Sequence, residues 1–339
     1  MLTLQIPRFL ASHAADPDWR QAAERCLAAL HPIPPQTTLG FLYATDHLAS
    51  ELSAILGYLK ERTGVGHWVG SVGHGICASG MEYHDRPALS MMLGCLPADS
   101  FQVFGLIDDR LSDFVSQHSA WYHQHQSRFG VVHGDPRNPK LPQLIRDLAA
   151  RLGDGFLVGG LTSSSTAYPQ IAGGMSEGGL SGVLLGSEVQ VATALSQGFT
   201  PFGTLHEINA CQDNILIALD GKPALEVLCE EVGEVLARQP EQTAGDIAVA
   251  LPIQGSDQGD YLVRNLLGYD RENKLLAIAE DVTLGQTIRF CRRDPESARE
   301  ELRHRLRALK ARAPSPPKGG STTPVLPAAH TCSDLIQWS

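Results

Sequence analysis

GFLYATDHLASELSAILGYLKERTGVGHWVGSV, residues 40–72, decides the fold of this chain. Residues 40–44 are almost all apolar and predict a buried strand. Residues 47–62 space their leucine and isoleucine side chains along one helical face, and Gly64 stands where helices commonly end. Residues 67–72 predict another strand, so the order is strand, helix, strand.

The same order recurs further along the chain. Residues 101–107 predict a strand, residues 141–152 a helix, and residues 156–161 a second strand. We interpret residues 108–140, which are rich in His, Asp and Arg, as an insert in this second copy. The recurrence leads to the hypothesis of an internal duplication.

Two short sequence echoes support the duplication. VGS at residues 69–71 matches VGG at 158–160, and ALSMMLG at 88–94 matches GLSGVLLG at 179–186. Strands that alternate with helices of this length favour a layered core. We therefore expect an α/β protein with a layered core built from repeated strand–helix–strand units.

A change in pattern near residue 200 predicts a second, smaller domain of the α/β or α+β class. Residues 197–203 are rich in turn-forming residues, and Asp220-Gly221 predicts a tight turn further on. The expected strands and helices around that turn lie at 214–219, 224–236, 261–269, 274–278, 287–291 and 294–311.

The chain ends in a segment rich in Pro, Gly, Ser and Thr, which is typical of a flexible tail or linker. The last nine residues have no partner element in view. We expect a first domain at 1–200, a second domain at 201–312 and a disordered tail at 313–339.

The charge balance excludes some partners. The 339 residues include 27 Lys and Arg against 37 Asp and Glu, a formal net charge of −10. Nucleic acids and anionic membranes require a positive surface, so neither is expected as a partner. The sequence has no signal peptide pattern and no apolar run as long as a membrane helix. The seven cysteines form no CxxC pair, which is typical of reduced thiols, and we expect a cytoplasmic protein.

Glycines cluster after the second strand of the opening stretch. Gly70, Gly73 and Gly75 surround Ser71 and His74. Glycine permits close approach to a ligand, and the backbone N–H groups of such a loop can bind an anion such as a carboxylate. A tight strand–loop corner explains the same glycines equally well, so both interpretations stay open.

A second polar loop follows the matching strand of the second copy. There Gly159 and Gly160 precede Thr162 and Ser163. If the duplication holds, the two loops lie at the carboxyl ends of matching strands, where α/β sheets usually bind ligands. They would then flank one crevice. An ordinary solvent-exposed loop is the alternative.

Histidines raise the question of a metal or haem site. His74 lies in the first glycine loop, close to Cys77, and His123 and His125 form a His-x-His pair in the insert. No spacing places a second ligand beside His74, so we assign no metal site and keep His74 as a candidate haem ligand.

Motifs of enzyme active sites do not occur in the sequence. There is no GxSxG elbow and no HExxH. A hydrolase that uses Asp108, Ser163 or Cys77 stays an alternative, but it depends on loop composition alone. A purely structural scaffold is a further alternative. We expect a binding protein and not an enzyme.

Several stretches resemble the N-terminal and C-terminal FIST domains of bacterial signal-transduction proteins. The most specific one starts with the Gln-Gly and Pro-Phe-Gly of residues 197–203 and continues through NILIALDGKPA at 214–224. Residues 16–22 resemble the first helix of the family, and residues 69–76 and 159–163 resemble its two glycine motifs. The resemblance covers roughly residues 8 to 311.

The resemblance implies an intracellular sensory module that binds a small molecule, with amino acids as the first ligands to test. The two glycine loops would form its site. It would signal to a separate partner such as a histidine kinase. Some relatives resemble haem proteins that respond to nitric oxide and regulate such a kinase, so haem is the alternative cofactor. The usual final strand and its Cys-x-Gly-Arg-Gly-like loop are not recognised after Pro314, where a Pro-rich tail stands instead.

Overall fold

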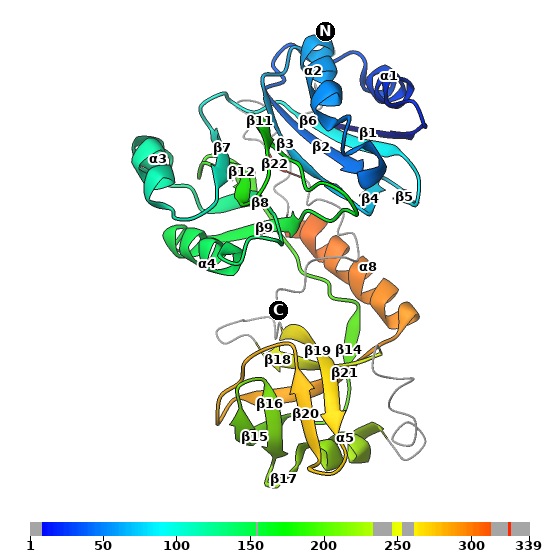
Figure 1. Ribbon diagram of the computed structural model, residues 1–339, viewed down its shortest axis with the longest axis vertical. Helices are drawn as coiled ribbons and strands as arrows, with labels where there is room; N and C mark the ends of the chain where they lie inside the picture. The colour runs from blue at the N-terminus through cyan, green and yellow to red at the C-terminus, as the bar shows by residue number, and fades with distance from the viewer. Residues whose placement is uncertain (1–8, 154, 233–245, 253–260, 313–324, 327–339) are drawn as a thin grey trace. The chain divides into compact units, whose positions relative to one another are not determined.

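The structure is a computed structural model that describes the chain except residues 1–8, 154, 233–245, 253–260, 313–324 and 327–339 (Figure 1). Its described part falls into two compact units. The first ends at Thr193 and includes the short strand β22 (Val325–Leu326), and the second spans Ala194–Ala311. Both units contain helices and sheets, so the predicted mixed α/β content is confirmed.

The first unit contains a six-stranded sheet. Its strands, in spatial order, are β1 (Phe9–Ala15), β6 (Ala88–Gly94), β2 (Leu39–Thr45), β3 (His67–Gly73), β10 (Gln170–Ala172) and β11 (Gly174–Ser176). Strands β2 and β3 are parallel, as a strand–helix–strand unit requires.

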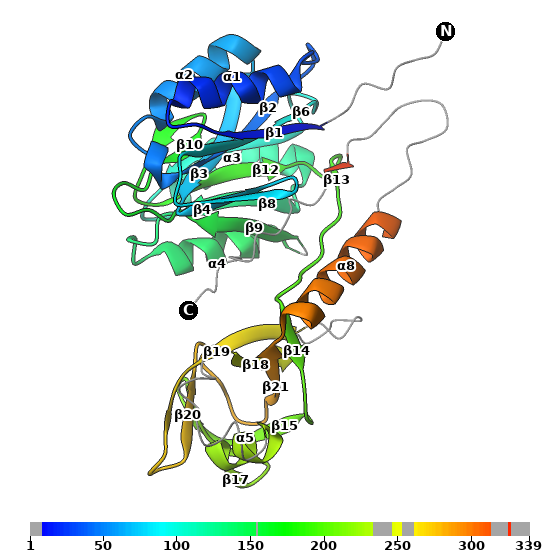
Figure 2. The same cartoon turned by 90° about the vertical axis from the view of Figure 1, so that its right-hand side faces the viewer.

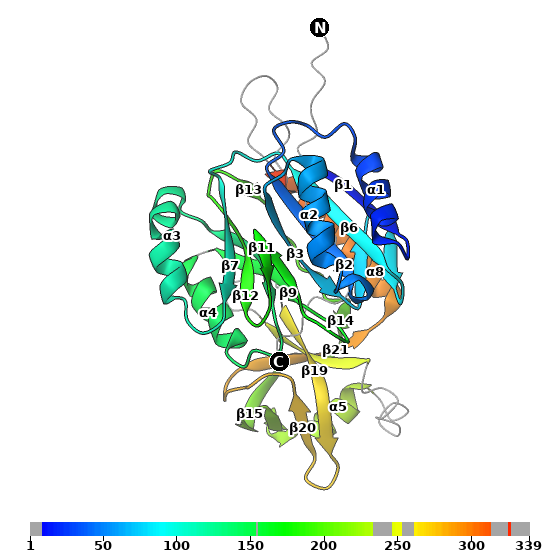
Figure 3. The ribbon, with the colours of Figure 1, turned by 45° about the horizontal axis from the view of Figure 1, so that its top comes forward.

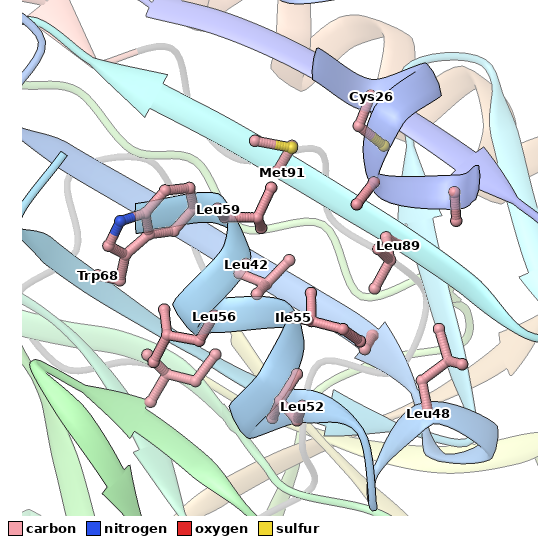
Figure 4. Close-up of a cluster of buried hydrophobic side chains, with 14 of the residues drawn as sticks. Cys26, Leu42, Leu48, Leu52, Ile55, Leu56, Leu59, Trp68, Leu89 and Met91 are labelled. Atoms are coloured by element: carbon pink, nitrogen blue, oxygen red, sulfur yellow. The ribbon is translucent and has the colours of Figure 1, made fainter. Parts of the chain in front are cut away.

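Helices α1 (Trp19–Leu30) and α2 (Leu52–Thr63) pack on one face of this sheet. Their buried side chains share one apolar cluster with Leu42 and with Trp68, which is fully buried (Figure 4). The apolar stripe predicted for residues 47–62 is the face of α2 that this cluster covers.

A four-stranded sheet forms the other half of the unit. It contains β7 (Phe101–Ile107), β12 (Leu180–Leu185), β8 (Phe129–Gly134) and β9 (Phe156–Leu161), in that spatial order. Helices α3 (Ser112–His125) and α4 (Leu141–Arg151) cover its outer face through a second cluster (Figure 3).

The inner faces of the two sheets meet in a third apolar cluster. Leu39, Phe41 and Val69 of the larger sheet lie there with Val183 and Leu185 of the smaller one. Figure 2 shows α1 and α2 on one side of the strands and α4 on the other. The residues between the two sheets are therefore shielded by helices on both sides.

The two halves repeat one topology. The strand order β1-β6-β2-β3 corresponds to β7-β12-β8-β9. Strands β8 and β9 are parallel, like β2 and β3, and the pair Val132–Gly159 takes the place of the pair Leu42–Gly70. This correspondence supports the hypothesis of an internal duplication.

The predicted insert was wrong. Residues 108–140 contain α3 and β8, and β8 is the true counterpart of β2. Helix α3 fully buries only Phe114 and His125. The partly buried Val115, Trp121 and Tyr122 complete its packed stripe, which histidines interrupt. A helix with such an interrupted stripe cannot be recognised from apolar spacing alone.

Two further elements complete the first unit. Strands β4 (Gly75–Ala78) and β5 (Met81–His84) form a separate hairpin. A short 3-10 helix, η1 (Asp46–Leu48), follows β2 directly.

The second unit is built around an antiparallel sheet. Its elements are β14 (Phe199–Pro201), β15 (His206–Gln212), β16 (Ile215–Leu219), β17 (Lys222–Pro223), α5 (Ala224–Val232), β18 (Ile247–Pro252), β19 (Tyr261–Asp270), β20 (Leu275–Ile278), β21 (Thr287–Arg293) and α8 (Pro295–Arg312). The strands expected at 214–219, 261–269, 274–278 and 287–291 are confirmed to within a few residues. The predicted turn is also present, because Asp220 and Gly221 both have positive φ.

Most of the predicted tail lies outside the described residues. Within it, however, Val325–Leu326 forms β22 and pairs in parallel with β13 (Gln190–Val191). The last nine residues, for which we expected no partner element, lie outside the described residues.

Candidate ligand-binding site

Gly70 and Gly159 lie inside strands and have a packing role. A Cβ on Gly70 would stand 1.7 Å from the carbonyl oxygen of Leu42, and one on Gly159 would stand 1.8 Å from that of Val132. Only glycine therefore allows each strand to approach its parallel neighbour this closely. Close packing of parallel strands therefore accounts for the repeated glycine at these two positions, and no ligand is required to explain it.

Gly73, Gly75 and Gly160 lie nearer the strand ends. A Cβ on Gly73 would meet the carbonyl oxygen of Gly75 at 2.8 Å, and one on Gly75 would meet the His84 ring at 2.6 Å. Gly160 is the register partner of His133 on β8. Gly73 and Gly75 thus keep a Cβ out of the crowded start of the β4–β5 hairpin.

The two glycine loops are in direct contact. The backbone N–H of His74 donates to Ser163 Oγ at 3.1 Å, and Ser163 N–H donates to the carbonyl of Val72 at 3.3 Å. The hydroxyls of Ser71 and Thr162 lie 2.9 Å apart. The structure thus brings together residues from both predicted loops, as the duplication implied.

Asp46 joins these loops, although the sequence did not single it out. It begins η1, at the carboxyl end of β2, and its side chain is only 12% exposed. Its Oδ2 lies 3.2 Å from His74 Nδ1 and accepts from Ser165 N–H at 3.0 Å. We name Asp46, His74, Ser163 and Ser165 the loop cluster. The detectable signal was an acidic residue right after a parallel strand.

A second set of polar residues lies deeper, between the sheets. One row crosses all six strands of the larger sheet through register partners. These residues are His13, Ser90, Tyr43, Ser71, Gln170 and Ser176. Side chains alternate along a strand, so Tyr43 shares the inner face with Phe41 of the inter-sheet cluster.

Three residues of the smaller half, Ser181, His133 and Thr162, contact this row through hydrogen bonds. Tyr43 Oη lies 3.0 Å from His133 Nε2, and Ser181 Oγ donates to Gln170 Oε1 at 2.6 Å. Ser181 and His133 are themselves register partners. We name the residues of the row and these three residues the polar band.

Burial keeps the central pair of the band uncharged. It lowers the pKa of His133 to about 4 and raises the pKa of Tyr43 to about 12. Both groups are therefore neutral at pH 7. His133 is 3% exposed, and its Nδ1 has no hydrogen-bond partner among the residues that the structure describes.

The other candidate ligands and nucleophiles do not form a site together. His74 is 59% exposed, and no group of three metal-binding side chains occurs in the described ranges. His123 and His125 lie on α3, where residues two apart point in different directions, and His125 Nδ1 contacts Glu188 at 2.6 Å. Cys77 is disulfide-bonded, so its thiol is not available as a nucleophile or ligand, contrary to the expectation of reduced thiols.

Two surface cavities lie elsewhere on the first unit. One of about 320 Å³ is lined by residues that include Tyr122, Arg128 and Arg151, and one of about 150 Å³ by residues that include Asp108 and Phe114. Neither is lined by the loop cluster or the polar band. The candidate site lies instead at the two loops, because hydrogen bonds there join residues from both copies of the repeat.

Two family models match this chain. The FIST N domain matches residues 38–222, and the FIST C domain matches residues 224–326. The chain belongs to the FIST family. FIST domains are associated with sensory roles in signal transduction and are not known as enzymes. The FIST N match extends beyond Thr193, where the first structural unit ends, and the FIST C match reaches β22.

Curated relatives of this FIST protein are mycobacterial. An uncharacterised protein of Mycobacterium tuberculosis strain H37Rv is 27% identical over 297 residues, which is 83% of this chain and 74% of the relative. An uncharacterised protein of Mycobacterium bovis is 25% identical over 291 residues, 81% of this chain and 72% of the relative. Among the described helices of the FIST protein, none is long and apolar enough to cross a membrane.

Proposed function

We propose that this FIST protein is an intracellular sensory module that binds a free amino acid at the loop cluster. The observation that carries the proposal is the contact between the two glycine loops, which brings Asp46, His74 and Ser163 together from both copies of the repeat. Ligand sites of α/β sheets commonly lie at such carboxyl ends.

The chemistry of the cluster suits a zwitterion. A carboxylate has acceptor capacity for several donors, so Asp46 can accept from an ammonium group in addition to Ser165 N–H. The exposed His74 ring can donate to a carboxylate, whereas the backbone N–H groups of His74 and Ser163 already donate within the loops. An acceptor and a donor side by side suit a ligand that carries both an ammonium and a carboxylate group.

We propose that the signal passes to a separate protein. We propose a histidine kinase or another signalling protein as that partner. Haem and hydrolysis stay predictions, since the described contacts of His74, Ser163 and Cys77 do not favour either.

Thermal unfolding of the purified protein with each free amino acid tests the proposal. A ligand at about 100 times its Kd stabilises the native state by about 2.7 kcal/mol, which gives a measurable rise in Tm. Asp46→Asn should weaken binding about tenfold or more, equivalent to about 1.4 kcal/mol. Asp109→Asn is the matched control, because Asp109 is 52% exposed and pairs with Lys140 outside the cluster. No Tm rise with any amino acid would refute the proposal.

A further inference from the structure

The loop cluster and the polar band are connected. Ser163 of the loop cluster directly follows Thr162, whose hydroxyl lies 2.9 Å from Ser71 of the polar band. Ser71 is in turn the register partner of Tyr43. The loop cluster therefore adjoins the buried polar band.

His133 carries an unused hydrogen-bonding atom in this band. Tyr43 occupies Nε2, while Nδ1 has no partner among the described residues although the side chain is 97% buried. A buried polar atom without a partner lowers the stability of the folded state. Such an atom is commonly explained by a ligand or a water molecule that binds to it. Ser176 Oγ, in the same band, is also without a partner in the described part of the chain.

The residues of the band set the chemistry of what they can bind. Apart from His13, the residues of the band carry hydroxyl or amide groups or belong to the Tyr43–His133 pair. Burial keeps this pair neutral at pH 7, because it lowers the pKa of His133 to about 4 and raises that of Tyr43 to about 12. A charged group placed there would lose its hydration without gaining a counter-charge. An apolar group would leave His133 Nδ1 unpaired.

The β4–β5 hairpin covers this region. Ile76 and Tyr83 of the hairpin pack with Tyr43 in a small apolar cluster, and Tyr83 Oη lies 2.5 Å from His13 Nδ1. Within the described residues the hairpin pairs with no other sheet. Its first strand begins at Gly75, next to His74, so the hairpin adjoins the loop cluster as well as the polar band.

We propose that the side chain of the bound amino acid enters the polar band, where Tyr43 and His133 select uncharged, hydrogen-bonding side chains such as the amides of glutamine and asparagine. This inference rests on the proposed function, because it names the ligands that the same site prefers. Tyr43 and His133 are thus residues that determine specificity, in addition to the anchoring residues of the loop cluster.

Calorimetric titration of the full chain with matched ligand pairs tests this inference. Glutamine against methionine compares an amide with an apolar side chain of similar length, and glutamine against glutamate compares neutral with charged. We expect glutamine to bind at least about tenfold more tightly than either, because a site that provides hydrogen bonds rejects analogues without them. Asparagine against leucine repeats the comparison for a shorter side chain.

The variants separate specificity from anchoring. His133→Phe should reduce the glutamine-to-methionine ratio to about one while methionine affinity stays unchanged. His123→Phe is the matched control, because His123 is exposed on α3. If His133→Phe does not fold, Tyr43→Phe and the imidazole ¹⁵N signals of wild-type His133 replace it, and glutamine should shift the Nδ1 signal.

The outcomes are distinguishable. Amino acids that bind without preference for amides, a preference that survives His133→Phe, or an unshifted Nδ1 signal on glutamine binding would overturn the inference and leave the proposed function intact. An unshifted signal would mean that Nδ1 is occupied by water. Failure of every amino acid to bind would overturn both.

Discussion

Gly70→Ala tests how closely strand β3 approaches strand β2. Gly57→Ala, on the neighbouring helix α2, is its matched control. The new Cβ would stand 1.7 Å from the Leu42 carbonyl oxygen and 2.7 Å from its carbonyl carbon. Both are backbone atoms of β2, so no rotamer change can relieve the clash, and β2 and β3 must separate. Overpacking in a core costs about 1–3 kcal/mol, and weakened ladder hydrogen bonds add about 1 kcal/mol each. We expect a loss of at least about 3 kcal/mol.

Gly57→Ala makes the same chemical change on α2 with the opposite expected sign. A Cβ there meets nothing within 4 Å, and Gly57 is exposed. Alanine in a helix interior is favoured over glycine by about 0.8–1.0 kcal/mol. Gly57→Ala should therefore stabilise the first unit by up to about 1 kcal/mol.

Urea unfolding followed by circular dichroism measures both variants, with Gly159→Ala as the equivalent of Gly70→Ala in the second copy. Two structural units can unfold separately, so the transition of the first unit must be identified by tryptophan fluorescence of the buried Trp68. A stability of Gly70→Ala within about 0.5 kcal/mol of the parent would refute the register of β2 and β3 and the duplication argument built on it.

Three further outcomes follow from buried polar groups and thiols. Burial alone would raise the pKa of Asp135, but hydrogen bonds from Arg137 and Gly178 hold it below its usual value. Its contribution to stability should be full above about pH 4 and disappear as pH falls through the folded pKa, and Asp135→Asn should remove that part of the acid dependence. His206 contacts Asp220 at 2.7 Å and Glu231 at 3.2 Å, so His206→Ala should destabilise the second unit by about 1–3 kcal/mol in urea unfolding, whereas His304→Ala on the exposed surface of α8 should not. Burial raises the pKa of Cys26 to about 11 and that of Cys291 to about 12, so maleimide labelling of the native protein at pH 8, read by peptide mass mapping, should leave both unmodified; rapid modification of either would contradict its burial.

Elements with a strong apolar pattern could be predicted from the sequence. Helix α2 and strands β2 and β3 were placed within a few residues, because a continuous core covers one face of each. Helix α3 was missed because histidines interrupt its packed stripe, so the segment was interpreted as a polar insert. Strand β8 was then hidden in the same apparent insert, which displaced the second copy of the repeat by one strand.

The candidate site was recognised only in part for a different reason. His74, Thr162 and Ser163 could be named because each follows a strand that the pattern already identified. Tyr43 and His133 could not, because each lies inside a strand and is indistinguishable in sequence from an ordinary half-buried residue. Their importance depends on the register between distant strands, which composition does not contain.

The duplication itself explains why these residues meet. Tyr43 follows Leu42 as His133 follows Val132, and the two pairs have the same place in matching parallel ladders. Matched positions of the two packed copies lie opposite each other, so a substitution at one position changes the contacts of the other. Identical residues would give a symmetric contact, whereas tyrosine against histidine leaves one imidazole nitrogen without a partner among the described residues. Divergence between the copies at this point therefore creates an asymmetric polar surface that neither copy could form alone.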